Sequence, residues 1–137
     1  MTGTGRRRRG RELALRVLFE LEGTDKDADW TLQYQAGELG ATADVLAFAR
    51  EIVVGCLERL DDVDGGISEA MANWDLEDVG KVERAVLRLG VFELLFERGT
   101  PVAVVIDESV ELTKTYAGLE AAQFVNGVLG QVARTSV

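Results

Sequence analysis

Five arginines stand among the first eleven residues of an otherwise acidic chain: Arg6, Arg7, Arg8, Arg9 and Arg11. The whole chain carries 15 basic and 24 acidic residues. Without the five arginines, residues 12–137 hold 10 basic against 24 acidic residues, a net charge of −14. Guanidinium groups bind phosphate oxygens bidentately, and each neutralised phosphate releases counterions. The cluster therefore favours nucleic-acid binding, with a solubilising tail as the alternative.

Other side chains could also contact a base or a phosphate. Phe19 follows Arg11 by two helical turns and offers a ring for base stacking, although a core position is the simpler explanation. A basic stripe at i, i+3 and i+7 is formed by Lys81, Arg84 and Arg88, with a plain solvated face as the alternative. Phe124 lies near the edge of an apolar stripe, where core packing competes with stacking. Beyond the arginine cluster, the candidate RNA contacts are Phe19, Lys81, Arg84, Arg88, Gln123 and Phe124.

Carboxylates concentrate around Trp74. They are Glu69, Asp75, Glu77, Asp78 and Glu83. An acidic patch repels RNA and attracts a basic protein, and the alternative is an ordinary hydrated surface. The candidate residues for binding a protein partner are Glu69, Asp75 and Glu83.

The residue types and motifs that the chain lacks exclude several kinds of catalytic, metal and nucleotide sites. The chain has no histidine and one cysteine, so the usual general base and the donors of a structural zinc site are missing. No GxGxxG or GxxxxGK[ST] motif is present. These features predict a protein that is not an enzyme and that needs no metal or cofactor.

The bulk properties describe one ordinary soluble domain. The 137 residues are 47% apolar and 28% charged, and no run of 18 apolar residues could span a membrane. The only stretch that could resemble a signal peptide is interrupted by charged residues, Glu12, Arg16, Glu20 and Glu22. The single cysteine, Cys56, suits a reducing compartment, so we expect a cytoplasmic protein.

The spacing of apolar residues predicts an all-α fold of about seven helices, without period-two strands or internal repeats. Residues 1–10 are expected to form a flexible arginine-rich arm, and residues 11–137 a single helical domain. The first helix should run from Arg11 to about Glu22, and a short one from Trp30 to Glu38. Residues 43–73 look helical apart from a break at 61–66, where the sequence is DDVDGG.

The second half of the chain contains the strongest helical pattern. Asp78 is predicted to cap a helix that ends near Gly99, with Thr100 as the next N-cap and Pro101 in the first turn that follows. This next helix should stop by Gly118. The Asn-Gly pair in FVNGVL, at 124–129, is typical of a hairpin, but the apolar set across 121–132 favours a helix. Gly127 would then mark the close approach of another backbone.

Three long segments resemble the bacterial transcription antitermination factor family NusB. They are RRRRGRELALRVLFELE, VERAVLRLGVFELLFERGTPVAVVIDESVELTKTYAG and QFVNGVLGQVA, in the order of the family. The resemblance runs nearly end to end and is weakest across 23–75. It implies an all-α fold of two small helical bundles.

The resemblance also implies a function. Proteins of this family pair with the ribosomal protein NusE and bind the single-stranded boxA element of nascent ribosomal RNA, which helps RNA polymerase to resist termination. The arginine cluster would then contact RNA, while the acidic remainder would suit a basic ribosomal partner. Glu83 and Phe124 match positions near the RNA and partner surface, and Phe19 matches a position where the family usually has a tyrosine.

Some positions depart from the family pattern. Phe19 keeps the ring but loses the hydroxyl, and Gln123 replaces a common lysine or arginine. Asp107 replaces an asparagine, and Gly130 an aspartate. We therefore expect the chain to bind RNA weakly without its partner.

Two alternatives remain. A stand-alone relative of the N-terminal domain of ribosomal RNA cytosine methyltransferases would share the fold, although 137 residues leave no room for a catalytic domain. A helical adaptor that homodimerises and binds only protein would need no RNA at all.

Overall fold

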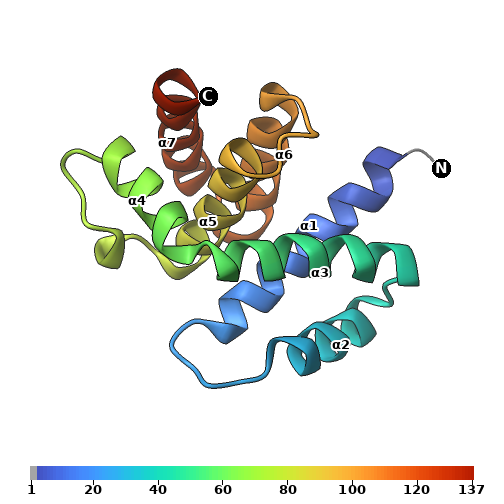
Figure 1. Cartoon of the computed structure of the whole chain (residues 1–137). Helices are drawn as coiled ribbons and strands as arrows, with labels where there is room; N and C mark the ends of the chain where they lie inside the picture. Colours follow the sequence, from blue (N-terminus) through green and yellow to red (C-terminus); the bar gives the residue numbers. More distant parts are fainter. Residues whose placement is uncertain (1–2) are drawn as a thin grey trace. The chain divides into compact units, whose positions relative to one another are not determined.

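The computed structural model describes residues 3–137, with side chains from residue 5 onward, and divides the chain into two compact units (Figure 1). Within these residues there are seven α-helices and one short 3-10 helix. The predicted all-α class and its two helical bundles are confirmed. No helix of the described part has the length and apolar character needed to cross a membrane.

The first unit, Met1–Leu57, contains α1 (Gly3–Leu21), α2 (Ala28–Leu39) and nearly all of α3 (Ala43–Glu58). Asp27 caps α2 by accepting a hydrogen bond from the backbone N–H of Trp30 at 2.8 Å. Gly40 ends α2 with a φ of 63°, a left-handed conformation that glycine adopts without strain. The helices bury a shared apolar core that includes Leu13, Val17, Leu32, Ala49, Ile52 and Val53.

The second unit, Glu58–Val137, contains α4 (Leu60–Ala70), the 3-10 helix η1 (Leu76–Asp78), α5 (Lys81–Leu95), α6 (Val102–Ala117) and α7 (Leu119–Ser136). Helix α5 lies at its centre and packs against α4, α6 and α7 (Figure 1). Gly118, with a φ of 94°, makes the sharp turn from α6 into α7. The core of this unit includes Val63, Ile67, Val86, Leu87, Val105, Val125 and Leu129.

The first helix begins earlier than the sequence predicts. It starts at Gly3 rather than Arg11, so residues 3–10 belong to α1 instead of forming a separate arm; residues 1 and 2 lie outside the described part. The apolar residues at helical spacing begin only after Arg11, so the spacing gives no sign of the earlier turns. A cluster of cations at a helix N-terminus also opposes the macrodipole. Tertiary contacts to α2 and α3 override this local preference.

The predicted break at 61–66 is also wrong. Those residues lie inside α4, and the chain breaks at Arg59 instead. Val63 and Ile67 are fully buried, and a Cβ on Gly66 would lie only 3.2 Å from Cδ1 of Leu95 on α5. Packing against α5 thus compensates for the low helix propensity of the glycine pair.

Three further details of the second unit differ from the prediction. Asp78 ends η1 and caps no α-helix, since α5 begins after Gly80. Pro101, not Thr100, occupies the N-cap of α6. Helix α7 continues through the Asn-Gly pair as predicted, but a Cβ on Gly127 would meet open space, so no close backbone explains this glycine.

Candidate nucleic-acid interface

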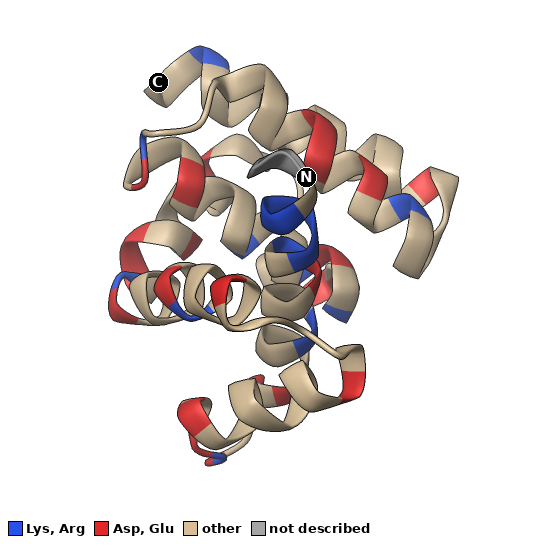
Figure 2. Cartoon of the chain, turned by 90° about the vertical axis from the view of Figure 1, so that its right-hand side faces the viewer, with Lys and Arg blue, Asp and Glu red and all other residues tan. Residues whose placement is uncertain are grey.

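The arginine cluster forms the first turns of α1. Arg6, Arg7, Arg8 and Arg9 are exposed, and Figure 2 shows basic residues gathered on these turns near the N-terminus. Four consecutive residues of a helix point in four directions about 100° apart. The guanidinium groups therefore surround this end of the helix rather than forming one stripe.

Two of these arginines contact the corner between α2 and α3. Nη1 of Arg6 donates to Oδ2 of Asp44 at 2.9 Å, an ion pair in which both side chains are more than half exposed. Nη2 of Arg9 donates to the carbonyl of Leu39 at 3.1 Å, at the C-terminal end of α2, where carbonyl groups lack helical partners. The hydrogen bond from Arg6 lowers the pKa of Asp44. These two contacts join the basic turns of α1 to α2 and α3 within the first unit.

Arg11 lies in the interior, unlike the exposed position that the sequence predicts. Only 5% of its surface is accessible, so its guanidinium is not presented to an RNA phosphate. Its Cζ lies 5.5 Å from the centre of the Phe48 ring on α3, and the Cζ of Arg7 lies 5.9 Å from the same centre. Both distances are in the range of cation–π interactions. Asp44 and Phe48 were missed from the sequence because nothing in the spacing of α3 relates them to the arginines.

Phe19 is 39% exposed and lies on the same helix as the arginines, so its ring is accessible. The neighbouring Glu20 links the C-terminal end of α1 to the loop that follows and to α2. Its Oε1 accepts from Nε2 of Gln35 at 2.7 Å, and its Oε2 accepts from Nζ of Lys26 at 3.1 Å. These two hydrogen bonds, that of Gln35 first, lower the pKa of Glu20.

The predicted basic stripe on α5 is largely tied to the protein itself. Nη1 of Arg84 donates to the carbonyls of Val79 at 2.6 Å and Leu76 at 3.2 Å, which fixes η1 against α5. Arg88 forms a bidentate pair with Asp64 of α4, with distances of 2.8 and 3.0 Å. Only Lys81 of the three is exposed.

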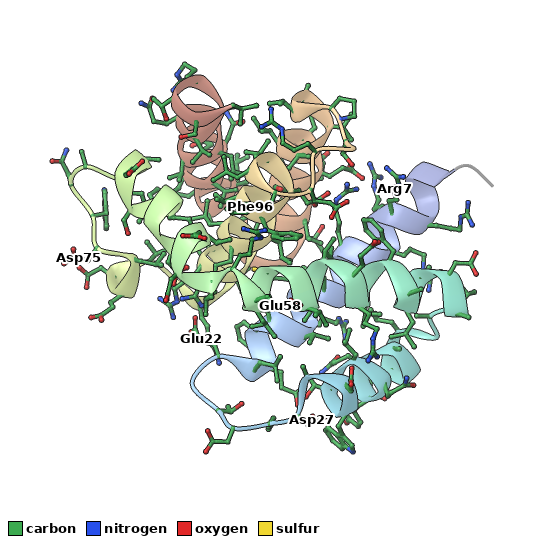
Figure 3. The ribbon with its side chains drawn as sticks, viewed as in Figure 1. Arg7, Glu22, Asp27, Glu58, Asp75 and Phe96 are labelled. Carbon is green, nitrogen blue, oxygen red and sulfur yellow. The ribbon has the colours of Figure 1, made fainter. Side chains whose placement is uncertain are left out.

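The candidate residues of the second unit meet around Trp74. This side chain is 57% exposed, and its ring packs edge-to-face on Phe124 of α7, with ring centres 6.0 Å apart. Phe124 is half-buried, and the adjacent Gln123 is exposed. Asp75 follows Trp74 in the loop after α4 (Figure 3). The structure thus brings a predicted RNA residue next to the predicted partner patch.

The three partner candidates differ in their surroundings. Glu69 on α4 and Asp75 are exposed, whereas Glu83 is half-buried in the first turn of α5. The Glu83 carboxylate lies close to Gly80: a Cβ built on Gly80 would be 2.6 Å from its Oε1. A carboxylate in the first turn interacts favourably with the helix dipole, which gives Glu83 a role within the fold. Among the described residues, no group of three or more metal-ligating side chains could hold a metal ion.

The profile of the NusB family matches residues 8–134. The chain belongs to the NusB family. Among curated relatives, the transcription antitermination protein NusB of Sorangium cellulosum is 43% identical over 129 residues, which cover 94% of this chain and 92% of the relative. NusB of Heliobacterium modesticaldum is 42% identical over 128 residues, and the chain spans 62% of the length of that protein. Membership of this family of transcription antitermination factors agrees with the prediction of a non-enzymatic function.

Several solved structures share the fold of this chain. T. maritima NusB is 35% identical, with a TM-score of 0.86 over 94% of this chain and 91% of that one. A chain from the crystal structure of the antitermination factors NusB and NusE in complex with double-stranded RNA is 27% identical, with a TM-score of 0.87 over 95% of this chain and 97% of that one. A chain from the crystal structure of a plectonemic RNA supercoil is 29% identical, with a TM-score of 0.89 over 96% of this chain and 99% of that one.

Proposed function

We propose that this protein binds RNA together with the ribosomal protein NusE in an antitermination complex, and that its RNA is the single-stranded boxA element of nascent ribosomal transcripts. The observation that carries the proposal is the exposed set of guanidinium groups on the first turns of α1. Membership of the NusB family supports it. So does the likeness to a NusB chain that was crystallised with NusE and RNA.

The phosphate contacts are assigned to Arg6, Arg7, Arg8 and Arg9. Each guanidinium carries five N–H donors. The hydrogen bonds of Arg6 to Asp44 and of Arg9 to Leu39 use only part of this capacity. Exposed ion pairs contribute little to stability, so a phosphate can compete for these groups. Because the arginines are already held in a helix, RNA binding needs less ordering than with a disordered arm.

The base contacts are assigned to Phe19, because its accessible ring lies on the same helix as the arginines. Gln123 and Lys81 stay as exposed candidates in the second unit. We leave three arginines out of the interface. Arg11 is buried, and Arg84 and Arg88 form hydrogen bonds within the protein.

The surface for NusE is assigned to the acidic loop region around Trp74. Glu69 and Asp75 supply exposed negative charge, and the large exposed ring of Trp74 supplies apolar area at the same place. Aromatic side chains commonly anchor protein interfaces, and complementary charge speeds the encounter with a basic partner. Glu83 contributes to the fold at the start of α5 and is not needed for this assignment.

A titration of fluorescently labelled boxA RNA tests the proposal. Binding should be weak with the isolated chain, tighten at least about tenfold when purified NusE is added, and weaken with a scrambled sequence of equal length. A duplex of the same sequence separates recognition of single strands from recognition of double-stranded RNA. Absence of binding at low salt, with and without NusE, would reject the proposal in favour of an adaptor that binds only protein.

A further inference from the structure

Gly10 interrupts the arginine cluster within α1, where glycine lowers helix stability by roughly 1 kcal/mol relative to alanine. The structure gives a reason for this glycine. Its backbone is buried against the Phe48 ring of α3, and a Cβ at position 10 would collide with Cδ2 of that ring. The same Cβ would lie 3.3 Å from Cε2 and 3.4 Å from Cγ. The ring thus occupies the space that any other residue would fill.

The same ring contacts the arginines on either side of Gly10. The Cζ atoms of Arg7 and Arg11 lie 5.9 and 5.5 Å from its centre. Positions 7, 10 and 11 have the i, i+3, i+4 spacing of a single helix face, so one ring can contact all three residues. Figure 3 shows Arg7 extending from these first turns of α1.

The first turns of α1 need such a contact in order to be helical. Four adjacent arginines repel one another, and their charge opposes the positive end of the helix dipole. An isolated segment with this sequence would stay disordered, as its composition predicts. Cation–π interactions and the close packing at Gly10 offset these penalties.

We propose that Phe48 is a positioning residue for RNA recognition, acting through its packing on Gly10 and its contacts with Arg7 and Arg11. It holds the exposed arginines in a fixed helical array before RNA arrives, so that RNA binding does not have to order them. This inference rests on the proposed RNA-binding function. Phe48 itself touches no RNA in this account.

Phe48→Ala and Gly10→Ala test the inference, with boxA RNA and NusE as the binding partners. Phe48→Ala should weaken RNA binding about 5- to 30-fold, because the two cation–π contacts are lost. Phe48→Tyr retains an aromatic ring and should bind like the wild type, while Phe48→Leu should be intermediate. Leu46→Ala, which removes a half-buried apolar side chain from the same helix, is the matched control and should change RNA affinity less than twofold.

Gly10→Ala separates positioning from helix propensity. Alanine raises the intrinsic helix propensity of the segment, but its Cβ displaces the Phe48 ring. We expect RNA affinity to fall despite the better helix former. The dependence of affinity on salt should stay the same in both variants, because the number of arginines is unchanged. Hydrogen exchange at the amides of residues 7–10 should become faster, which reports the loss of order directly.

The outcomes separate the two claims. If the wild-type protein binds no RNA with NusE present, the proposed function fails. If the wild type binds but Phe48→Ala and Gly10→Ala bind equally well, the function stands and the role of Phe48 is rejected. Should Phe48→Ala fail to fold, Phe48→Leu, Phe48→Tyr and Gly10→Ala give the same comparison. Wild-type affinity of Gly10→Ala with unchanged hydrogen exchange would also reject the inference.

Discussion

At the scale of single residues, most arginines of the first turns already have partners within the protein. Arg6 is paired with Asp44, Arg9 is bonded to the end of α2, and Arg7 lies over Phe48. RNA must therefore compete with the polar contacts of Arg6 and Arg9, whereas the cation–π contact of Arg7 takes no hydrogen-bond donor away from a phosphate. Asp44 is the most direct competitor, since its carboxylate occupies the same donor that a phosphate would use.

Replacing this competitor should strengthen RNA binding. Asp44→Asn removes the ion pair with Arg6 and one negative charge near the proposed interface. We expect affinity for boxA RNA at low salt to rise about two- to fivefold, the range that an exposed ion pair would allow. Fluorescence titration measures the change, and Glu51→Gln, an exposed carboxylate further along α3, is the control. An affinity that is unchanged or lower would show that Arg6 contacts no phosphate.

Glu20 should make the stability of the protein depend on pH. Its pKa is lowered from 4.5 because the charged form accepts hydrogen bonds from Gln35 and Lys26. The stabilisation is therefore complete above the pKa of the unfolded chain and is lost as pH falls through the lower pKa of the folded state. We expect Glu20→Gln to lower the free energy of unfolding by about 1 kcal/mol at pH 7, and by progressively less as pH falls below about 4.5.

Urea unfolding at pH 7, 4.5 and 3 measures this dependence. Asp25→Asn, an exposed carboxylate in the same loop region as Lys26, should change stability little at any of the three values. A Glu20→Gln difference that stays constant down to pH 3 would mean that the ionised carboxylate is not the stabilising form.

At the scale of helices, the glycine pair in α4 can be tested directly. Gly65 is exposed and a Cβ there would meet nothing within 4 Å, whereas a Cβ on Gly66 would lie 3.2 Å from Leu95. Gly65→Ala should raise the free energy of unfolding by about 0.5–1 kcal/mol, because alanine is the better helix former. Gly66→Ala should raise the free energy of unfolding by less, because its Cβ would crowd Leu95. Thermal or urea unfolding decides between these outcomes, and a destabilising Gly65→Ala would mean that the segment is not helical.

The helices were predictable where a long apolar pattern spans them. The pattern of α5, α6 and α7 depends on residues such as Val86, Val105 and Leu129, which are all buried. The errors occurred where distant contacts override local preference. Phe48 of α3 packs on Gly10 and contacts Arg7 in α1, and Leu95 packs on Gly66 in α4. Neither contact can be inferred from spacing.

The site was predictable to a similar extent. Composition identified the arginines of α1 and the carboxylates near Trp74, because charge clustering is visible in one dimension. The structural roles of three other charged residues were not predictable from the sequence. Arg84 donates to backbone carbonyls, Arg88 pairs with a side chain of another helix, and Glu83 lies at a helix end.

At the scale of the whole molecule, the protein combines a basic helix end with an acidic remainder. The net charge of −9 over the chain should limit indiscriminate binding to nucleic acids and favour a basic protein partner. The chain belongs to the NusB family, and a chain from a crystal structure of NusB and NusE in complex with double-stranded RNA shares its fold.

The acidic region around Trp74 should control the rate at which NusE binds. Reversing charge in the double variant Glu69→Lys, Asp75→Lys should slow association about 3- to 10-fold at low ionic strength, and the effect should shrink as salt screens the charges. Stopped-flow fluorescence at two salt concentrations measures the rates. Asp25→Lys with Glu38→Lys gives the same change of charge in the first unit as a control. Equal association rates in the wild type and in both double variants would mean that NusE binds elsewhere on the protein.

The salt dependence of RNA affinity tests the central claim most directly. Arg6, Arg7, Arg8 and Arg9 are all replaced by glutamine, and the slope of log affinity against log salt is compared with that of the wild type in the presence of NusE. Each phosphate contact with a single strand contributes about 0.7 to the slope, so we expect its magnitude to fall by about 2 to 3. Replacing Arg50, Arg98, Lys114 and Arg134 by glutamine changes the net charge equally and should leave the slope nearly unchanged. A slope that is the same in the wild type and in the variant of the first turns would contradict the account, because α1 would then make no phosphate contacts.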